Sequence, residues 1–133
     1  MTVADEMRFD GQVAVVTGAG GGLGKEYALL LASRGARVVV NDIGGSVTGD
    51  GADSEAAETV AREIRERGGE AIADGHSVTS PEGAAAIIDT AANAWGRLDI
   101  VINNAGIVRD AAFEEMTIDQ FDLLLDVHLR GAF

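Results

Sequence analysis

Cysteine is absent from this sequence of 133 residues, and proline and tyrosine each occur once. Without cysteine, the chain has neither disulfide bonds nor thiolate ligands for a metal. Long apolar runs are also missing, because the longest ones are far shorter than the ~20 residues of a membrane-spanning helix. The first ten residues lack the apolar block and the cleavage site of a secretory signal. We therefore expect no membrane span and a cytoplasmic location.

Positive charge is scarce as well. Ten Lys and Arg residues stand against 22 Asp and Glu residues, which gives a formal net charge of -12. Lys25 is the single lysine, and the arginines do not cluster. Proteins hold nucleic-acid phosphates chiefly with clustered basic residues, so we expect no nucleic-acid partner. With 47% hydrophobic residues, the composition is that of an ordinary globular domain.

Apolar, β-branched runs alternate with amphipathic helical patterns along the chain. The predicted strands are 13–17, 37–41, 70–73 and 98–103, and the predicted helices are 22–33, 54–67, 80–96 and one that starts at Thr117 and continues to near Phe133. Ser80 before Pro81 is a typical helix start, and Thr117 with Gln120 forms a capping-box pattern. The alternation predicts an α/β fold with a doubly wound parallel sheet, covered by helices on both faces. In the Rossmann type of this fold, which we expect here, the strand order is 3-2-1-4.

Helical spacing predicts which side chains pack inward. In the first helix these are Leu23, Tyr27, Leu30 and Leu31, so we interpret Tyr27 as a packing residue. In the second helix they are Ala57, Val60, Ala61 and Ile64. In the third helix they are Ala84, Ile87, Ile88, Ala91 and Trp95, and in the last helix Phe121, Leu124, Leu125, His128 and Leu129.

A glycine-rich segment joins the first strand to the first helix. Residues 17–24 read Thr-Gly-Ala-Gly-Gly-Gly-Leu-Gly. Glycines let the backbone approach a pyrophosphate, and a helix N-terminus offers free N–H groups and a partial positive charge. The segment therefore predicts dinucleotide binding. One alternative is a turn that binds nothing; the other, a P-loop, has Ala19 in place of its first glycine and Glu26 in place of its magnesium-binding hydroxyl residue.

Asp42 follows the second predicted strand. In a dinucleotide-binding fold, a carboxylate at this point accepts hydrogen bonds from the adenine ribose hydroxyls and repels a 2'-phosphate. No Lys or Arg follows it directly to compensate such a phosphate. Asp42 therefore favours NAD over NADP, the alternative being an ordinary aspartate at a strand end.

Two motifs make the sequence resemble the short-chain dehydrogenase/reductase family. Residues 17–24 match the T-G-x-x-x-G-x-G motif, residues 103–106 match N-N-A-G, and the resemblance covers practically the whole chain. Within the family, the sequence is similar to the hydroxyacyl-CoA dehydrogenase unit of peroxisomal multifunctional enzymes of type 2 and their bacterial relatives. The stretches that carry this narrower similarity are Asn41–Asp42 with the Gly44–Gly45 loop, Asn103–Asp110 with its Arg109–Asp110 pair, and Val127–His128–Leu129. The resemblance implies hydride transfer between nicotinamide and a secondary alcohol or ketone, with a 3-hydroxyacyl-CoA as a candidate substrate.

The resemblance also implies the residues that bind the cofactor. The implied contacts are Gly18, Gly22, Leu23 and Gly24 at the pyrophosphate, Asp42 at the adenine ribose, Ser77 and Val78 at the adenine, and Asn104, Ala105 and Gly106 along the cofactor. His128 stands where many members have the asparagine of the catalytic tetrad, so the sequence departs here from the family's proton relay; a partly buried histidine on a helix face is the alternative. His76 has no partner at metal-ligand spacing, so we interpret it as a loop residue and expect no metal.

The family's catalytic pair, a tyrosine followed four residues later by a lysine, is missing. Leu31 stands four residues after Tyr27, and Lys25 precedes it. We therefore expect the 133 residues to be inactive alone, as one NAD(P)-binding Rossmann domain spanning residues 1–133 and incomplete at its C-terminus. A natural short protein that binds NAD or a partner without catalysis is the alternative. An open edge at the fourth strand and a bare last helix predict a homo-oligomer.

Overall fold

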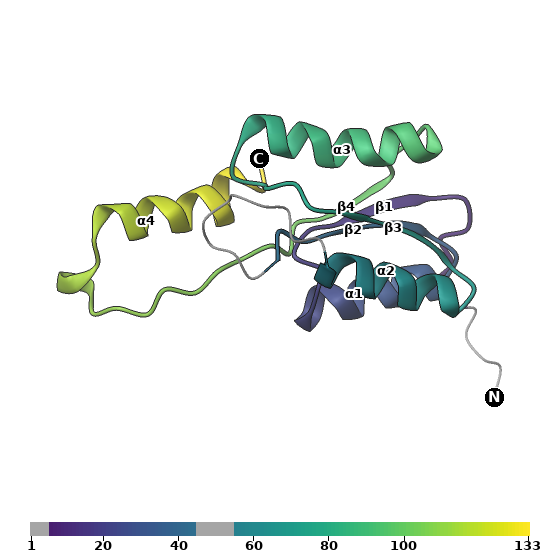
Figure 1. Ribbon diagram of the computed structural model, residues 1–133, viewed down its shortest axis with the longest axis horizontal. Helices are drawn as coiled ribbons and strands as arrows, with labels where there is room; N and C mark the ends of the chain where they lie inside the picture. The colour runs from purple at the N-terminus through teal and green to yellow at the C-terminus, as the bar shows by residue number, and fades with distance from the viewer. Residues whose placement is uncertain (1–5, 45–54) are drawn as a thin grey trace.

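The computed structural model describes residues 6–44 and 55–133, and it contains the predicted parallel sheet (Figure 1). The strands are β1 (Val13–Val16), β2 (Arg37–Asn41), β3 (Glu70–Asp74) and β4 (Ile100–Ile102). They lie in the order β3-β2-β1-β4 and all pair in parallel, with Val13 opposite Arg37 and Ala14 opposite Ile100. This confirms the predicted fold class and strand order. The predicted helix start at Ser54 and most of the glycine-rich loop before it lie outside the described residues.

Helices cover both faces of the sheet, as Figure 1 shows. One face carries α1 (Gly22–Ser33) and α2 (Glu55–Glu66), and the other carries α3 (Pro81–Trp95). After β4 the chain forms a short 3₁₀ turn, η1 (Phe113–Glu115), and then α4 (Ile118–Leu125), which extends beyond the sheet. A π-helical turn, η2 (Asp126–Arg130), continues α4. Neither η1 nor the π-helical turn was predicted.

The core lies on both faces of β1 and β2. Ala14 and Val16 pack toward α1 and α2, whereas Val13 and Val15 pack with Ile87 of α3. Strands that are buried on both sides are typical of a doubly wound sheet and explain the continuous valine runs. β4 is shorter than predicted. The carboxylate of Asp99, just before it, accepts a hydrogen bond from the backbone N–H of Val13 at 2.8 Å.

The buried face of α1 differs from the predicted one. Leu23 and Leu30 are 68% and 49% exposed, and Tyr27 is 38% exposed, so Tyr27 is not a core residue. The buried residues of α1 are Gly24, Ala28, Leu31 and Ala32. Because three of these four are small, the helix packs close to the sheet and its larger side chains turn outward.

The other helices follow their predictions more closely. All four residues predicted for α2 are buried, and Ile87 and Ala91 are buried in α3. Ile88 is exposed, contrary to prediction, because α3 covers β1 and β2 and leaves it above an open groove beside Val101. The predicted caps are confirmed: the Ser80 hydroxyl accepts from the Gly83 N–H at 3.0 Å, and Thr117 and Gln120 form a capping box.

The β4 edge and α4 are open to solvent. Val101 of β4 is 46% exposed, and α4 has no buried residue. The inward packing predicted for Phe121, Leu125 and Leu129 is therefore absent from the structure. Homo-oligomer formation through these surfaces stays a prediction. No helix in the described ranges has the length and apolarity that a bilayer crossing requires.

Candidate functional site

The carboxyl ends of the four parallel strands meet at one edge of the sheet, where open α/β folds bind ligands. A cleft of about 310 Å³ lies there. It is lined by loops that follow all four strands and by one face of α4 and η2. Six of the predicted cofactor contacts line this cleft: Gly18, Asp42, Ser77, Val78, Ala105 and Gly106.

Packing within the protein requires two of the motif glycines. Gly18 has a φ of +65°, and a Cβ there would lie 2.8 Å from the Cα of Ala105. A Cβ on Gly24 would overlap the carbonyl oxygen of Gly18 and the side-chain nitrogen of Asn104. The first turn of α1 is therefore pressed against the glycine loop, a close approach that no other residue type allows.

The N-N-A-G segment is tied to the glycine loop by Thr17. The buried Thr17 hydroxyl accepts hydrogen bonds from the backbone N–H groups of Asn104 (3.2 Å) and Ala105 (3.0 Å). In return, the Asn104 side chain donates to the carbonyl oxygens of Thr17 and Gly18, both at 3.1 Å. The side chain of Asn104 thus holds the two loops together and does not line the cleft. Gly22, Leu23 and Gly24 also lie outside its lining, and their contact with a cofactor stays a prediction.

The Asp42 carboxylate is held in place by backbone groups. Its Oδ2 accepts from the N–H of Gly20 at 2.9 Å, and its Oδ1 accepts from the N–H of Gly44 at 2.8 Å. Its own backbone N–H donates to the carbonyl oxygen of Asp74 at 3.0 Å. A carboxylate oxygen has two lone pairs, so each oxygen retains acceptor capacity for a hydroxyl in the cleft.

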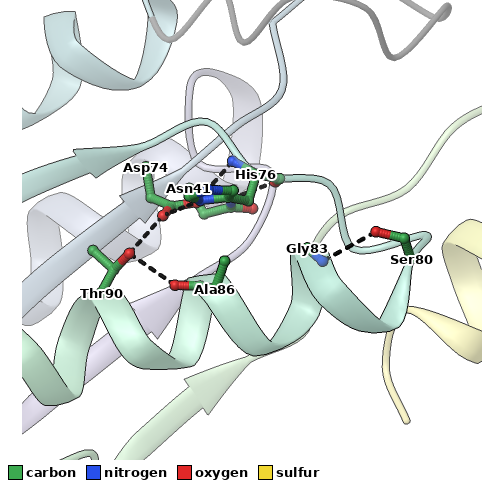
Figure 2. Close-up of polar contacts among 7 residues, drawn as sticks. All are labelled: Asn41, Asp74, His76, Ser80, Gly83, Ala86 and Thr90. Atoms are coloured by element: carbon green, nitrogen blue, oxygen red, sulfur yellow. Dashed lines mark hydrogen bonds and ion pairs between the residues drawn. The ribbon is translucent and has the colours of Figure 1, made fainter.

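A buried polar network lies at the end of β3 and is drawn in Figure 2. Asp74 is only 5% exposed and accepts hydrogen bonds from Asn41 Nδ2 (2.8 Å), Thr90 Oγ1 (2.7 Å), and the backbone N–H and ring Nδ1 of His76 (both 2.9 Å). Asn41 Nδ2 also lies 2.9 Å from the carbonyl oxygen of His76. The network joins β2, β3 and α3, and it fixes the start of the loop that carries Ser77 and Val78.

Hydrogen bonding decides the charge state of Asp74. Burial alone acts to raise its pKa, but the hydrogen bonds from His76, Thr90 and Asn41 together outweigh burial and hold the pKa below its usual range. Asp74 is therefore ionised at neutral pH. His76 lies in a loop as predicted, but its partner Asp74 was missed. The available signal was that Asn41 and Asp74 end neighbouring parallel strands.

His128 connects η2 to the loop after β4. Its Nε2 lies 2.8 Å from the carbonyl oxygen of Ile107 and 3.1 Å from the N–H nitrogen of the same residue. A Cβ on Gly106 would lie 2.8 Å from the His128 ring, so this glycine lets the ring approach. His128 is exposed and lies outside the lining of the cleft at the carboxyl ends of the strands. The correspondence of His128 to the asparagine of the catalytic tetrad stays a prediction.

Eight residues of the cleft lining had no predicted role, and four of them shape the site most. Ile43, Leu123 and Val127 form apolar parts of its wall, and Arg109 contributes a cation. Leu123 and Val127 are four residues apart on one helical face, a spacing that was available in the sequence. Within the described residues, no three His, Asp or Glu side chains are grouped closely enough to hold a metal.

The chain is similar in sequence and structure to short-chain dehydrogenases. A family model described as short chain dehydrogenase matches residues 12–133. The peroxisomal multifunctional enzyme type 2 of Drosophila melanogaster is 56% identical over 128 residues, which are 96% of this chain and 21% of that protein. A crystal structure of a short chain dehydrogenase from Mycobacterium avium has a TM-score of 0.84 at 50% identity, covering 92% of this chain and 43% of that one. A 7α-hydroxysteroid dehydrogenase complexed with NADH and 7-oxo glycochenodeoxycholic acid has a TM-score of 0.82 at 36% identity, covering 93% and 45%.

The chain spans less than half of the length of each of these three proteins. Relatives from Neurospora crassa, Mus musculus, Saccharomyces cerevisiae and Dictyostelium discoideum, which are 50% to 52% identical, also have names that begin with "Peroxisomal". The predicted cytoplasmic location is therefore wrong: it was based on the lack of a secretory signal, which does not distinguish the cytoplasm from a peroxisome.

Proposed function

Because this chain belongs to the short-chain dehydrogenase family, we propose that it provides the NAD-binding part of an enzyme that transfers hydride between nicotinamide and a secondary alcohol or ketone. The observation that carries the proposal is the Asp42 carboxylate, held at the cleft by the N–H groups of Gly20 and Gly44. In this position it accepts hydrogen bonds from both ribose hydroxyls of NAD. A 2'-phosphate in the same position would meet a negative charge.

The residues present fit a dinucleotide. Gly18 and Gly24 let the glycine loop and the first turn of α1 lie close together. The first N–H groups of a helix have no partner within the helix, so this turn is suited to a pyrophosphate. The apolar side chains of Ile43, Val78 and Val127 form a wall suited to a purine. When bound, the cofactor accepts or supplies the hydride, and these residues bind and orient it.

A 3-hydroxyacyl-CoA is the substrate that we propose. Support comes from the 56% identity to a peroxisomal multifunctional enzyme type 2. It also comes from the stretches that carry the resemblance, which contribute Asp42, Arg109 and Val127 to the lining of the cleft. The sequence contains no tyrosine followed four residues later by a lysine. We therefore propose that these residues bind the cofactor and do not catalyse the reaction alone.

The Asp42→Ala variant tests the cofactor assignment by calorimetric titration of the chain with NAD and NADP. We expect NAD affinity to fall about a hundredfold, because two hydrogen bonds to a charged acceptor are lost. NADP affinity should stay equal or rise, since the repulsion of its phosphate is removed. The preference for NAD over NADP should therefore nearly disappear.

Asp89→Ala is the matched control, because Asp89 is exposed on α3 and away from the cleft while its loss changes the net charge equally. It should leave both affinities unchanged. If Asp42→Ala retains the wild-type preference, another residue reads the ribose and the NAD assignment is wrong.

A further inference from the structure

The cofactor cleft contains a single cation among the described residues. Its lining includes two charged side chains, Asp42 and Arg109. Asp42 follows β2, whereas Arg109 lies in the loop after β4, so the fold brings together two residues that are distant in the sequence. The rest of the lining is apolar or neutral.

The guanidinium of Arg109 is not engaged by an acidic residue. Its one hydrogen bond runs from Nη1 to the neighbouring carbonyl oxygen of Val108 at 2.8 Å, and no ion pair involves it within residues 6–44 and 55–133. Two other basic residues, one near the glycine loop and one in η2, have acidic partners. Lys25 forms an ion pair with Glu63 at 2.9 Å, and Arg130 forms one with Asp126 at 3.3 Å. Arg109 therefore has most of its donors free in the cleft.

The charge of Arg109 favours the binding of a phosphate group in the cleft. The chain has a net charge of -12, and any nucleotide that enters the cleft carries phosphate charge of the same sign. Arginine remains charged at every physiological pH and offers a planar fork of donors that matches phosphate oxygens. A single unpaired arginine in an otherwise uncharged or acidic cleft is thus suited to receive a phosphate group.

We propose that Arg109 binds a phosphate group of the nucleotide that occupies this cleft. The inference rests on the proposed function, because it takes the cleft to be the nucleotide site. NAD and an acyl-CoA both carry phosphates next to adenosine. Asp42 lines the same cleft and suits the ribose of NAD, so we assign the phosphate to the cofactor and let the experiment separate the two sources.

The test compares Arg109→Gln, Arg109→Lys and wild-type chains in calorimetric titrations with adenosine, ADP, NAD and coenzyme A. We expect Arg109→Gln to weaken ADP and NAD binding about tenfold, as for a lost charge-assisted hydrogen bond, and to leave adenosine binding unchanged. Arg109→Lys should recover part of the affinity, because it keeps the charge without the fork. The salt dependence of NAD binding should also become weaker in Arg109→Gln.

Arg62→Gln is the matched control for charge, because Arg62 is exposed on α2 and does not line the cleft. It should change none of the affinities. A loss in Arg109→Gln confined to coenzyme A would support phosphate binding and assign it to the substrate. An equal loss for adenosine and ADP would overturn the inference, since the arginine would then contact the base.

The outcomes also separate this inference from the proposed function. If the wild-type chain binds NAD and Arg109→Gln binds it equally well, the inference alone fails. If the folded wild-type chain binds none of the four ligands, the nucleotide site itself is wrong and both proposals fail.

Discussion

Gly24 shows how tightly a single residue of the site is determined. Its position against the Gly18 carbonyl oxygen and the Asn104 side chain leaves no room for a Cβ. Gly21, three residues earlier in the same motif, has no atom within 4 Å of an ideal Cβ and an extended φ of -171°. Two glycines of one motif therefore differ in what they contribute: Gly24 is required by the folded protein itself.

We expect Gly24→Val to lower the free energy of unfolding by about 3 kcal/mol, because its side chain displaces the backbone of the glycine loop. Gly21→Ala should cost less than about 1 kcal/mol, the usual effect at a helix N-cap. Urea unfolding of both variants and the wild type measures the difference. Equal stability of the two variants would show that the contact at Gly24 relaxes without cost.

Among the elements, α4 and the η2 turn that continues it are attached to the protein without any buried residue. The hydrogen bond between His128 of η2 and the loop after β4 therefore contributes to the position of this helix. His128 Nε2 faces both the carbonyl oxygen and the N–H of Ile107, but one nitrogen serves only one of them at a time. A glutamine side chain has both a donor and an acceptor at about the same reach.

We therefore expect His128→Gln to retain the contact between η2 and the loop after β4, and His128→Leu to lose it. The loss should amount to about 1 kcal/mol, the net value of an exposed hydrogen bond. Hydrogen exchange of the Ile107 amide measures this directly: it should be faster in His128→Leu and near the wild-type rate in His128→Gln. Identical rates in all three proteins would mean that the contact does not hold this loop.

At the scale of the whole molecule, several carboxylates have pKa values that are lowered by hydrogen bonds. Hydrogen bonds from Arg8, Lys25 and Arg97 lower the pKa values of Asp10, Glu63 and Asp99, respectively. For Asp74, hydrogen bonds outweigh an opposing effect of burial and lower the pKa as well. A carboxylate with a lower pKa in the folded state stabilises the fold above its unfolded pKa and loses this effect as the pH falls through the folded value.

The free energy of unfolding should therefore fall steeply below about pH 4, near the ordinary pKa of these groups. Urea unfolding between pH 3 and pH 7 measures the profile. Thr90→Val removes one hydrogen bond to Asp74, so its profile should lie closer to the wild type at pH 3 than at pH 7. A wild-type stability that does not change between pH 6 and pH 3 would contradict the expectation.

Local patterns in the sequence determined much of this protein. The valine runs, the caps at Ser80 and Thr117, and the glycine motif each depend on neighbouring residues, and each predicted its element correctly. The fold class and the strand order were predicted from the order of these elements, and the family from the resemblance carried by the motifs at residues 17–24 and 103–106. The buried face of α2 was also predicted correctly, because its alanine, valine and isoleucine residues contrast sharply with the charged residues around them.

Only the tertiary structure decided what depends on residues that are distant in the chain. In the folded protein, the small residues of α1 face the sheet. Asp74 accepts hydrogen bonds from residues of β2 and α3. Arg109 lines the same cleft as Asp42. The physical reason is that hydrophobic periodicity reports how a segment is divided between core and solvent, whereas a cleft or a buried hydrogen-bond network arises where separate segments meet. Those meetings follow from the order in which the strands pair in the parallel sheet, which no local pattern of residues contains.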